Sequence, residues 1–321
     1  TTLTNSKVAR NTITSSGNYV GGFAGFMTQS GVSFTLNDLV SDTCTVQGKS
    51  YVGGFAGQHS WSHGGSLYRG HIRGGSVTGT GDYVGGFCGL AGGLGIHNSS
   101  NSANVVGVNE VGGFVGRKQG ANFQYNKNTG DVTGNNYVGG LIGQEQTAQY
   151  PAQILYSVNA GRVKGNNYVG GLRGYAYHTS TDAATQSTNL GEVEGNMYVG
   201  GIVGWSQGKT SSNINAAKVS GNNYVGGIVG YQSNYPGYSR SANNSIHVGQ
   251  VYGTSNVGNV AGYYEDGTYL PKDSNEYKND ILRMKELGFN TLRKHIKIEP
   301  EIFYYYCDKL GMLVVQDMIN S

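Results

Sequence analysis

The sequence YVGGLIG at residues 137–143 is one copy of a pattern that recurs nine times and decides the fold of most of the chain. In each copy a valine is followed by glycine at the first and fifth positions and by an apolar residue at the third. The nine motif valines are Val20, Val52, Val84, Val111, Val138, Val169, Val199, Val225 and Val257. A nearly constant spacing of about thirty residues is typical of units that stack on one another.

The residues around the motif favour strands. They form short runs of β-branched and aromatic residues separated by Gly and Asn, and no helical period persists for two turns within 1–262. A unit of this size cannot bury its thin apolar edge alone, whereas stacked coils can. The sequence therefore predicts an all-β repeat, a β-solenoid of nine coils, for residues 1–262.

Two details of the solenoid follow from the pattern. The valine and the third-position residue are an odd number apart, so a straight strand would turn them to opposite faces. We expect the glycine pair to adopt positive φ, bend the chain and turn both side chains toward one interior. We also expect a ladder of hydrogen-bonded asparagines between coils, formed by Asn101, Asn128, Asn159, Asn189 and Asn215.

Composition excludes several classes of protein. Glycine makes up 55 of 321 residues without a G-X-Y period, which excludes collagen. Charged residues are 13% and the net charge is +3, too sparse for a nucleic-acid binder. No apolar run is long enough to span a membrane. Cys44, Cys88 and Cys307 lack a C-x-x-C spacing, and the sequence predicts no cofactor.

Charge and glycine content change abruptly near the C-terminus. The last 50 residues carry eight Lys/Arg and eight Asp/Glu, against fourteen and eleven in the preceding 271, and three glycines follow Gly262. We interpret YYEDGTYLPKDSNEYK (263–278) as a linker. An error in assembling the sequence would also produce such a boundary, and a sequencing read through 255–290 tests that alternative.

Residues 279–321 follow a different pattern. A helix is predicted to begin at Asp280, then a strand in FNTLRKHI (289–296), a helix from Pro300, and a buried strand in MLVVQDM (312–318). This order is typical of a parallel α/β protein. The predicted buried helix residues are Ile281, Met284, Leu287, Phe303, Cys307 and Leu310. We expect so small a segment to lie against the open end of the solenoid or to remain loosely ordered.

The stretches after each motif vary most and are rich in Tyr, Trp, Ser and Asn. Aromatic rings stack on sugar rings, so we interpret these stretches as loops that either bind glycans or simply solvate the surface. The candidate aromatic residues are Tyr175, Trp205, Tyr231, Tyr235 and Tyr238.

Other patterns that suggest chemistry are weak. GGLGIH (92–97) carries His97 where calcium-binding repeats carry Asp. His59 and His63 are four apart but outside any predicted helix, and we expect both at the surface. Cys88 occupies a slot held elsewhere by Ala or Val, which predicts a buried apolar role. No catalytic or metal-binding residue is predicted in the solenoid.

The copies at 137–143, 198–204 and 224–230 resemble the GLUG motif. Such arrays occur in large secreted or surface-attached bacterial proteins, including adhesin-like chains. The resemblance implies a secreted or cell-surface location and a structural or adhesive role, with glycans or the host-surface matrix as partners. No signal-peptide pattern is present in this chain.

Residues 280–320 resemble the early catalytic barrel of glycoside hydrolase family 2, in MKELGFNT and CDKLG especially. That family has a (β/α)8 barrel with two catalytic carboxylates. The resemblance implies substrate-binding roles for Arg293, His295 and Asp317, and it places the two catalytic Glu beyond Ser321. The histidine follows the arginine by two residues, whereas many family members have three.

Two functions remain open on this basis. One is a structural or adhesive solenoid without a complete active site in this chain. The alternative is a piece of a β-galactosidase-like enzyme that carries the repeats as an accessory module. The alternative reading of Arg293, His295 and Asp317 is an ordinary scaffold role.

Overall fold

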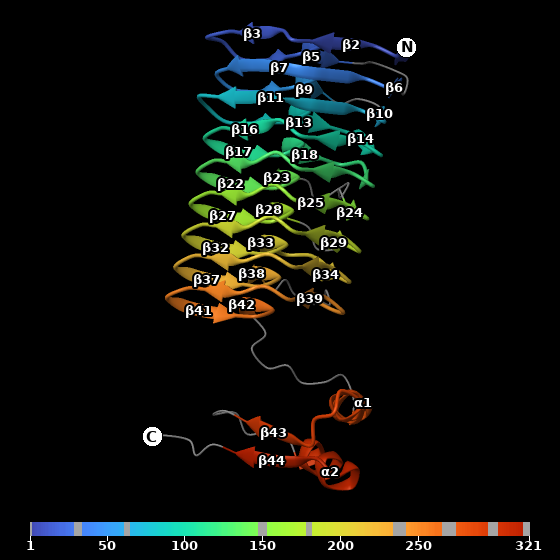
Figure 1. The fold of residues 1–321 in the computed structure, drawn as a ribbon, viewed down its shortest axis with the longest axis vertical. Helices are drawn as coiled ribbons and strands as arrows, with labels where there is room; N and C mark the ends of the chain where they lie inside the picture. The colour runs from blue at the N-terminus through green and yellow to red at the C-terminus, as the bar shows by residue number, and fades with distance from the viewer. Residues whose placement is uncertain are drawn as a thin grey trace. The chain divides into compact units, whose positions relative to one another are not determined.

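The computed structural model describes residues 2–28, 34–60, 65–146, 153–177, 182–233, 242–264, 274–294 and 301–316. The chain divides into two compact units, Thr1–Glu265 and Asp266–Ser321. The first unit is a β-solenoid whose parallel coils stack in sequence order, which confirms the predicted all-β repeat fold (Figure 1).

Four parallel sheets, here called A to D, run along the stack, and each motif copy gives one strand to sheet C and one to sheet D. Sheet A contains β1 (Thr2–Thr4), β6 (Phe34–Asn37), β10 (Gly65–Tyr68), β14 (Leu94–His97), β19 (Phe123–Gln124), β24 (Ile154–Leu155), β29 (Asp182–Thr185) and β34 (Lys209–Ser211). Sheet B contains β2 (Lys7–Ala9), β3 (Thr12–Thr14), β7 (Val40–Gly48), β11 (His71–Gly79), β15 (Ser100–Asn101), β16 (Asn104–Val106), β20 (Lys127–Asn128), β21 (Val132–Thr133), β25 (Val158–Asn159), β26 (Val163–Lys164), β30 (Thr188–Asn189), β31 (Val193–Glu194), β35 (Ile214–Asn215), β36 (Val219–Ser220), β39 (Ile246–His247) and β40 (Val251–Tyr252).

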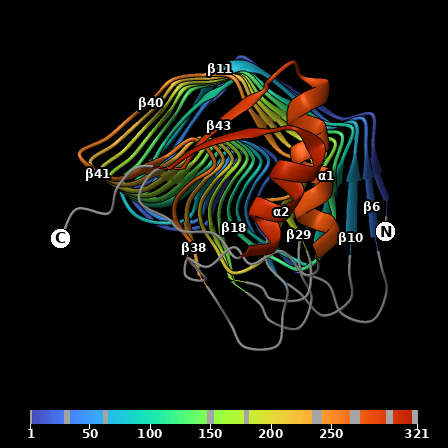
Figure 2. The same cartoon turned by 90° about the horizontal axis from the view of Figure 1, so that it is seen from below.

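The motif itself builds the other two sheets, and equivalent strands superpose when the stack is seen from its end (Figure 2). Sheet C contains β4 (Val20–Gly21), β8 (Val52–Gly53), β12 (Val84–Gly85), β17 (Asn109–Gly112), β22 (Asn136–Gly139), β27 (Asn167–Gly170), β32 (Met197–Gly200), β37 (Asn223–Gly226) and β41 (Ser255–Gly258). Sheet D contains β5 (Ala24–Thr28), β9 (Ala56–Ser60), β13 (Cys88–Gly92), β18 (Val115–Gln119), β23 (Ile142–Glu145), β28 (Arg173–Ala176), β33 (Val203–Ser206), β38 (Val229–Gln232) and β42 (Ala261–Tyr264).

The apolar interior consists of two separate columns, so the expectation of one shared interior is wrong. Motif valines such as Val138 pack with the sheet B valines, Val132 among them. The third-position residues, such as Leu141, pack in a second cluster with sheets A and D. Because of the odd spacing, the motif valine and the third-position residue point into different columns. Each column repeats in register from coil to coil.

The motif positions require glycine because no room exists there for a Cβ atom. The prediction that these glycines adopt positive φ is wrong. None of them lies in the left-handed region; instead the preceding tyrosine does, as at Tyr137 with φ 57°. A Cβ on Gly139 would lie 2.0 Å from the Ile142 carbonyl oxygen, and one on Gly140 would lie 2.2 Å from the Gly171 oxygen. Backbone atoms cannot move away from such contacts, so the coils approach closely only with glycine here.

The predicted asparagine ladder is confirmed. The Nδ2 atom of each ladder residue donates to the Oδ1 atom of the next at 2.8–2.9 Å, along Asn101, Asn128, Asn159, Asn189 and Asn215. The same Nδ2 atoms also donate to a backbone carbonyl two residues later, for example from Asn128 to Gly130 at 2.8 Å. All five side chains are buried, so these bonds satisfy polar groups that water cannot reach.

The C-terminal unit contains α1 (Ser274–Glu286), β43 (Thr291–Lys294), α2 (Glu301–Leu310) and β44 (Leu313–Gln316), with β43 and β44 paired in parallel. This is the predicted helix–strand–helix–strand order. However, α1 begins at Ser274, within the range predicted as linker (263–278), because Tyr277 extends the buried face one turn before Ile281. Strand β42 also extends to Tyr264 inside that range.

The burial prediction for this unit is right in part. Ile281, Phe303 and Cys307 are buried, as expected, and Leu310 is partly buried. Met284 and Leu287 are exposed, which makes their predicted burial wrong, since α1 packs through Tyr277 and Ile281 instead. The prediction of a buried final strand is right for one side only: Met312 is buried and Val314 partly buried, whereas Leu313 and Val315 are exposed.

Candidate functional site: an aromatic strip

Three of the five candidate aromatic residues lie together on one surface, in strands. Tyr175, Trp205 and Tyr231 belong to β28, β33 and β38, so the prediction that they lie in loops is wrong. The strand continues past the last motif glycine, with alternate side chains turned into the interior and outward. Tyr235 and Tyr238 lie outside the described residues.

These rings form a column along the stack. Tyr175 stacks on Trp205 with centroids 4.5 Å apart and planes 4° apart, and Trp205 stacks on Tyr231 at 6.3 Å and 6°. Because their strands pair in register, Tyr175 with Trp205 and Trp205 with Tyr231, the repeat itself sets this alignment. Stacked and edge-to-face geometries are the favoured arrangements for such rings.

A second column runs beside the first and was missed in the sequence analysis. It contains the motif tyrosines Tyr137, Tyr168, Tyr198 and Tyr224, whose successive centroids lie 4.8–5.1 Å apart. The columns meet edge to face, for example between Tyr168 and Tyr175 at 81°. We call the two columns together the aromatic strip: Tyr137, Tyr168, Tyr175, Tyr198, Trp205, Tyr224 and Tyr231.

The strip is partly exposed and uncharged. Burial raises the pKa of Tyr175 to about 12 and raises the pKa of Tyr168 and Tyr198 as well, so the phenols stay protonated at neutral pH. Within each column the ring faces turn toward neighbouring rings, which leaves ring edges and hydroxyl groups for contact with a ligand. A neutral ligand with many hydroxyl groups matches this surface.

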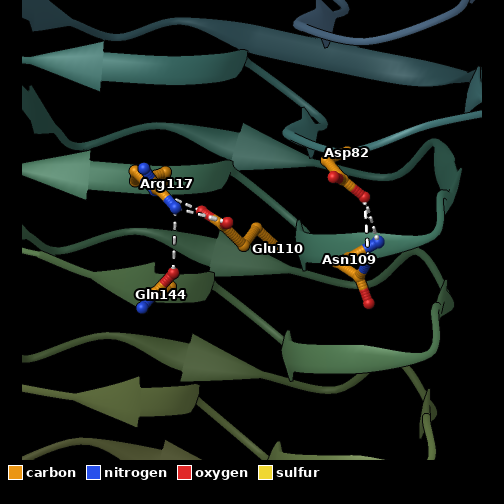
Figure 3. A network of polar contacts seen from close by, with 5 residues as sticks. All are labelled: Asp82, Asn109, Glu110, Arg117 and Gln144. Atoms are coloured by element: carbon orange, nitrogen blue, oxygen red, sulfur yellow. Dashed lines mark hydrogen bonds and ion pairs between the residues drawn. The ribbon is translucent and has the colours of Figure 1, made fainter.

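At the fourth coil an ion pair between Glu110 and Arg117 takes the place of a stacked motif tyrosine (Figure 3). Glu110 stands in the motif-tyrosine position, and Arg117 stands in the position of Tyr175. Arg117 donates to both carboxylate oxygens of Glu110 and, at 3.4 Å, to Gln144, while its guanidinium lies 4.6 Å from the Tyr83 ring centroid. Burial raises the pKa of Glu110, and the Arg117 hydrogen bonds oppose that shift.

A cluster of charged side chains lies inside the solenoid, in positions that most other coils fill with apolar or small residues. Arg173 and Glu145 form an ion pair, and both are almost completely buried, as is Lys118 in the neighbouring strand position. The Lys118 ammonium donates to the Gly120 carbonyl. Burial lowers the pKa of Lys118 to about 7, and the Glu145 carboxylate opposes that shift.

The structure also places the residues that carried weaker signals. His59 is buried, so its predicted surface position is wrong; its Nδ1 atom donates to the Gly92 carbonyl at 2.5 Å, and burial lowers its pKa. His63 lies outside the described residues. Cys88 is buried, as predicted, and burial raises its pKa to about 12. In the described ranges, no group of three or more His, Cys, Asp or Glu comes together as a metal site.

Of the three residues implied by the glycosidase resemblance, Arg293 lies in the described part of the chain. Arg293 is exposed on β43, opposite Val315 of β44. His295 and Asp317 lie outside the described residues.

A signal for the missed residues was present in the sequence. Tyrosine precedes the motif valine in seven of nine copies, and those seven residues have φ between 54° and 62°. Glu110 and Arg117 are paired departures from the repeat within one copy. Lys118, Glu145 and Arg173 are charged residues at positions whose equivalents are small or apolar in most other coils. Predicting that they lie close together would have required knowing which positions point inward.

Comparison with known protein families, with curated proteins and with solved structures found no match. Among the helices that the structure describes, none has the length and apolar character needed to cross a membrane.

Proposed function

We propose that this chain is an extracellular bacterial structural or adhesive repeat protein that binds carbohydrate through the aromatic strip. The observation that carries the proposal is the strip itself, seven Tyr and Trp side chains aligned on four successive coils of a regular scaffold. Tyr and Trp supply large contact areas at low entropic cost and dominate many binding surfaces. The GLUG-like motifs add support for a secreted or surface location.

The geometry favours a ligand that follows the stack. Successive coils repeat at the strand spacing, so a linear polysaccharide lying along the strip meets aromatic side chains coil after coil. Phenol hydroxyls both donate and accept hydrogen bonds, which suits sugar hydroxyls. The indole N–H of Trp205 adds a donor in the same surface.

A glycan array with the full chain tests this proposal. Trp205→Ala removes the central ring of its column, and we expect binding to weaken about tenfold or more because stacked aromatic anchors contribute strongly. Tyr125→Ala is the matched control, since Tyr125 is exposed and stacked on Tyr156 but lies outside the strip. Absence of glycan binding by the wild type, or an equal loss in both variants, would contradict the proposal.

A second candidate is favoured by the parallel pairing of β43 and β44 through α2, the connection found in (β/α) barrels. It is that the solenoid is an accessory module of a larger glycoside hydrolase of family 2. Reading the gene beyond the codon for Ser321 tests it. An in-frame barrel with two catalytic glutamates supports this candidate, and a stop codon at that point removes it.

A further inference from the structure

The last coil of the solenoid leaves apolar side chains uncovered that the coil before it buries. Val257 and Val260 are 44% and 48% exposed, whereas Val225 and Ile228 in the preceding coil are fully buried. In the first coil that the structure describes, Val20 is only 5% exposed. The motif valines therefore lean toward the following coil, and the C-terminal end presents the valines that a further coil would cover.

The backbone at this end is also unpaired. Between the last two coils, the amides of Gly227 and Ile228 donate to the carbonyls of Gly258 and Val260 at 3.0 Å. The equivalent amides of the last coil belong to Asn259 and Val260, and neither donates to any of the residues that the structure describes. An open sheet edge of this kind is a template for pairing with another chain.

The first coil offers the matching groups. Phe23 donates its amide to the Phe55 carbonyl at 2.9 Å, but its own carbonyl receives no backbone bond within the described ranges. Its strands β2 to β5 have the same arrangement as strands β39 to β42 of the last coil, because both are copies of one repeat. In addition, Leu3 and Phe26 of this coil are exposed apolar residues.

We propose that the C-terminal coil binds the N-terminal coil of a second copy of this chain, so that solenoids join end to end. The contact continues the interface that already joins the nine coils: the Val260 amide donates to the Phe23 carbonyl, and the valine column passes from Val251 to Ile13. Because the two ends differ, the contact does not close on itself, and further copies can add to each free end.

Sedimentation velocity of the full chain over a range of concentrations tests the assembly. We expect the wild type to form dimers and longer species as concentration rises. Val260→Lys places a charge on the end face, and we expect at least tenfold weaker association. Val106→Lys is the matched control, since Val106 is an exposed valine on β16 in the middle of the stack. A wild type that stays monomeric, or a Val260→Lys variant that assembles normally, would overturn the proposal.

Disulfide trapping tests the register. Asn18 and Ser255 occupy the same repeat position in the first and last coils, both are exposed, and the native cysteines described are buried. Mixing Asn18→Cys chains with Ser255→Cys chains under oxidation should give a crosslinked dimer, because paired strand positions lie within disulfide reach. Asn18→Cys chains mixed with Asn136→Cys chains should not crosslink, because Asn136 lies in a coil in the middle of the stack. If the C-terminal unit of the same chain covers this end instead, the first pair fails to crosslink and the proposal falls.

Discussion

Strand β44 (LVVQ) is more apolar than strand β23 (IGQE), but its apolar side chains are more exposed. In β23 of the solenoid, Ile142 is fully buried between neighbouring coils. In β44 of the C-terminal unit, Leu313 is 63% exposed and Val315 47% exposed. Both strands carry a parallel neighbour, but β23 has one on each side and a packed interior, whereas β44 pairs with β43 in a two-stranded sheet. Burial is thus set by the neighbours on every side of a strand and not by its own hydrophobicity.

The glycines of the two units differ in the same way. Gly139 is surrounded by backbone atoms of its own and adjacent coils, whereas nothing lies within 4 Å of a Cβ built on Gly288 in the C-terminal unit. Gly288 has φ +88°, so it serves the conformation that ends a helix. Glycine thus permits close approach in the solenoid and a left-handed turn in the C-terminal unit.

The largest expected effect is that of Gly139→Ala. The new Cβ would lie 2.0 Å from a carbonyl oxygen, so we expect the free energy of unfolding to fall by about 4 kcal/mol or more. Urea denaturation followed by tryptophan fluorescence measures this loss, because both tryptophans of the sequence fall within the range 1–265 of the first unit. Gly288→Ala is the control; because Gly288 lies in the C-terminal unit, its effect is read by circular dichroism at 222 nm, and it should cost about 1 kcal/mol through φ alone. Equal losses would show that space is not what selects glycine in the motif.

The next largest loss of stability is expected when the buried ion pair of Arg173 and Glu145 is broken. Arg173→Met removes the guanidinium that is paired with the buried Glu145 carboxylate, and we expect a loss of about 3–5 kcal/mol in the free energy of unfolding. The double variant Arg173→Met/Glu145→Leu removes both charges and should recover most of that loss. If the double variant is as unstable as the single one, packing rather than charge explains the effect.

The repeat made much of the solenoid predictable. Nine copies in one register identified the strands, and the spacing of Asn101 to Asn215 identified the ladder before any coordinates were considered. The error about Gly139 arose because a glycine in sequence does not reveal whether φ or space requires it. The sequence also does not show which position after the motif faces inward, so the ion pair of Glu145 with Arg173 and the burial of Lys118 beside it were not predicted.

The C-terminal unit was harder to predict because each element occurs once. The order of elements was right, but a single apolar position such as Leu287 does not distinguish a face that packs from one that stays exposed. The aromatic strip could be predicted from the sequence only in part. Trp205 was selected by residue type, whereas its partner column at Tyr168 required knowing that the two positions are adjacent in space.

Replacing Lys118 is expected to change the free energy of unfolding by a smaller amount, and this change depends on pH. Its pKa is about 7 in the folded protein and near 10.5 when unfolded, so folding favours the neutral amine. The corresponding stability is complete above the unfolded pKa and is lost as pH falls toward 7. Lys118→Met should therefore stabilise the solenoid by about 1–4 kcal/mol at neutral pH and flatten the rise in stability between pH 7 and 10. Lys49→Met, at an exposed site, should leave both unchanged; a similar flattening there would contradict this role for Lys118.

The smallest expected effect tests the difference in burial between β23 and β44. Leu313→Ala removes a side chain that is already in solvent, so we expect the stability of the C-terminal unit to change by no more than about 0.5 kcal/mol. Circular dichroism at 222 nm follows this unit, because both helices of the described chain lie in it. Leu141→Ala in the solenoid should cost about 2–5 kcal/mol by fluorescence, since that side chain is fully buried. A loss at Leu313 approaching that at Leu141 would mean that β44 is covered in solution, and the contrast between the two units would then reflect a missing neighbour rather than an exposed strand.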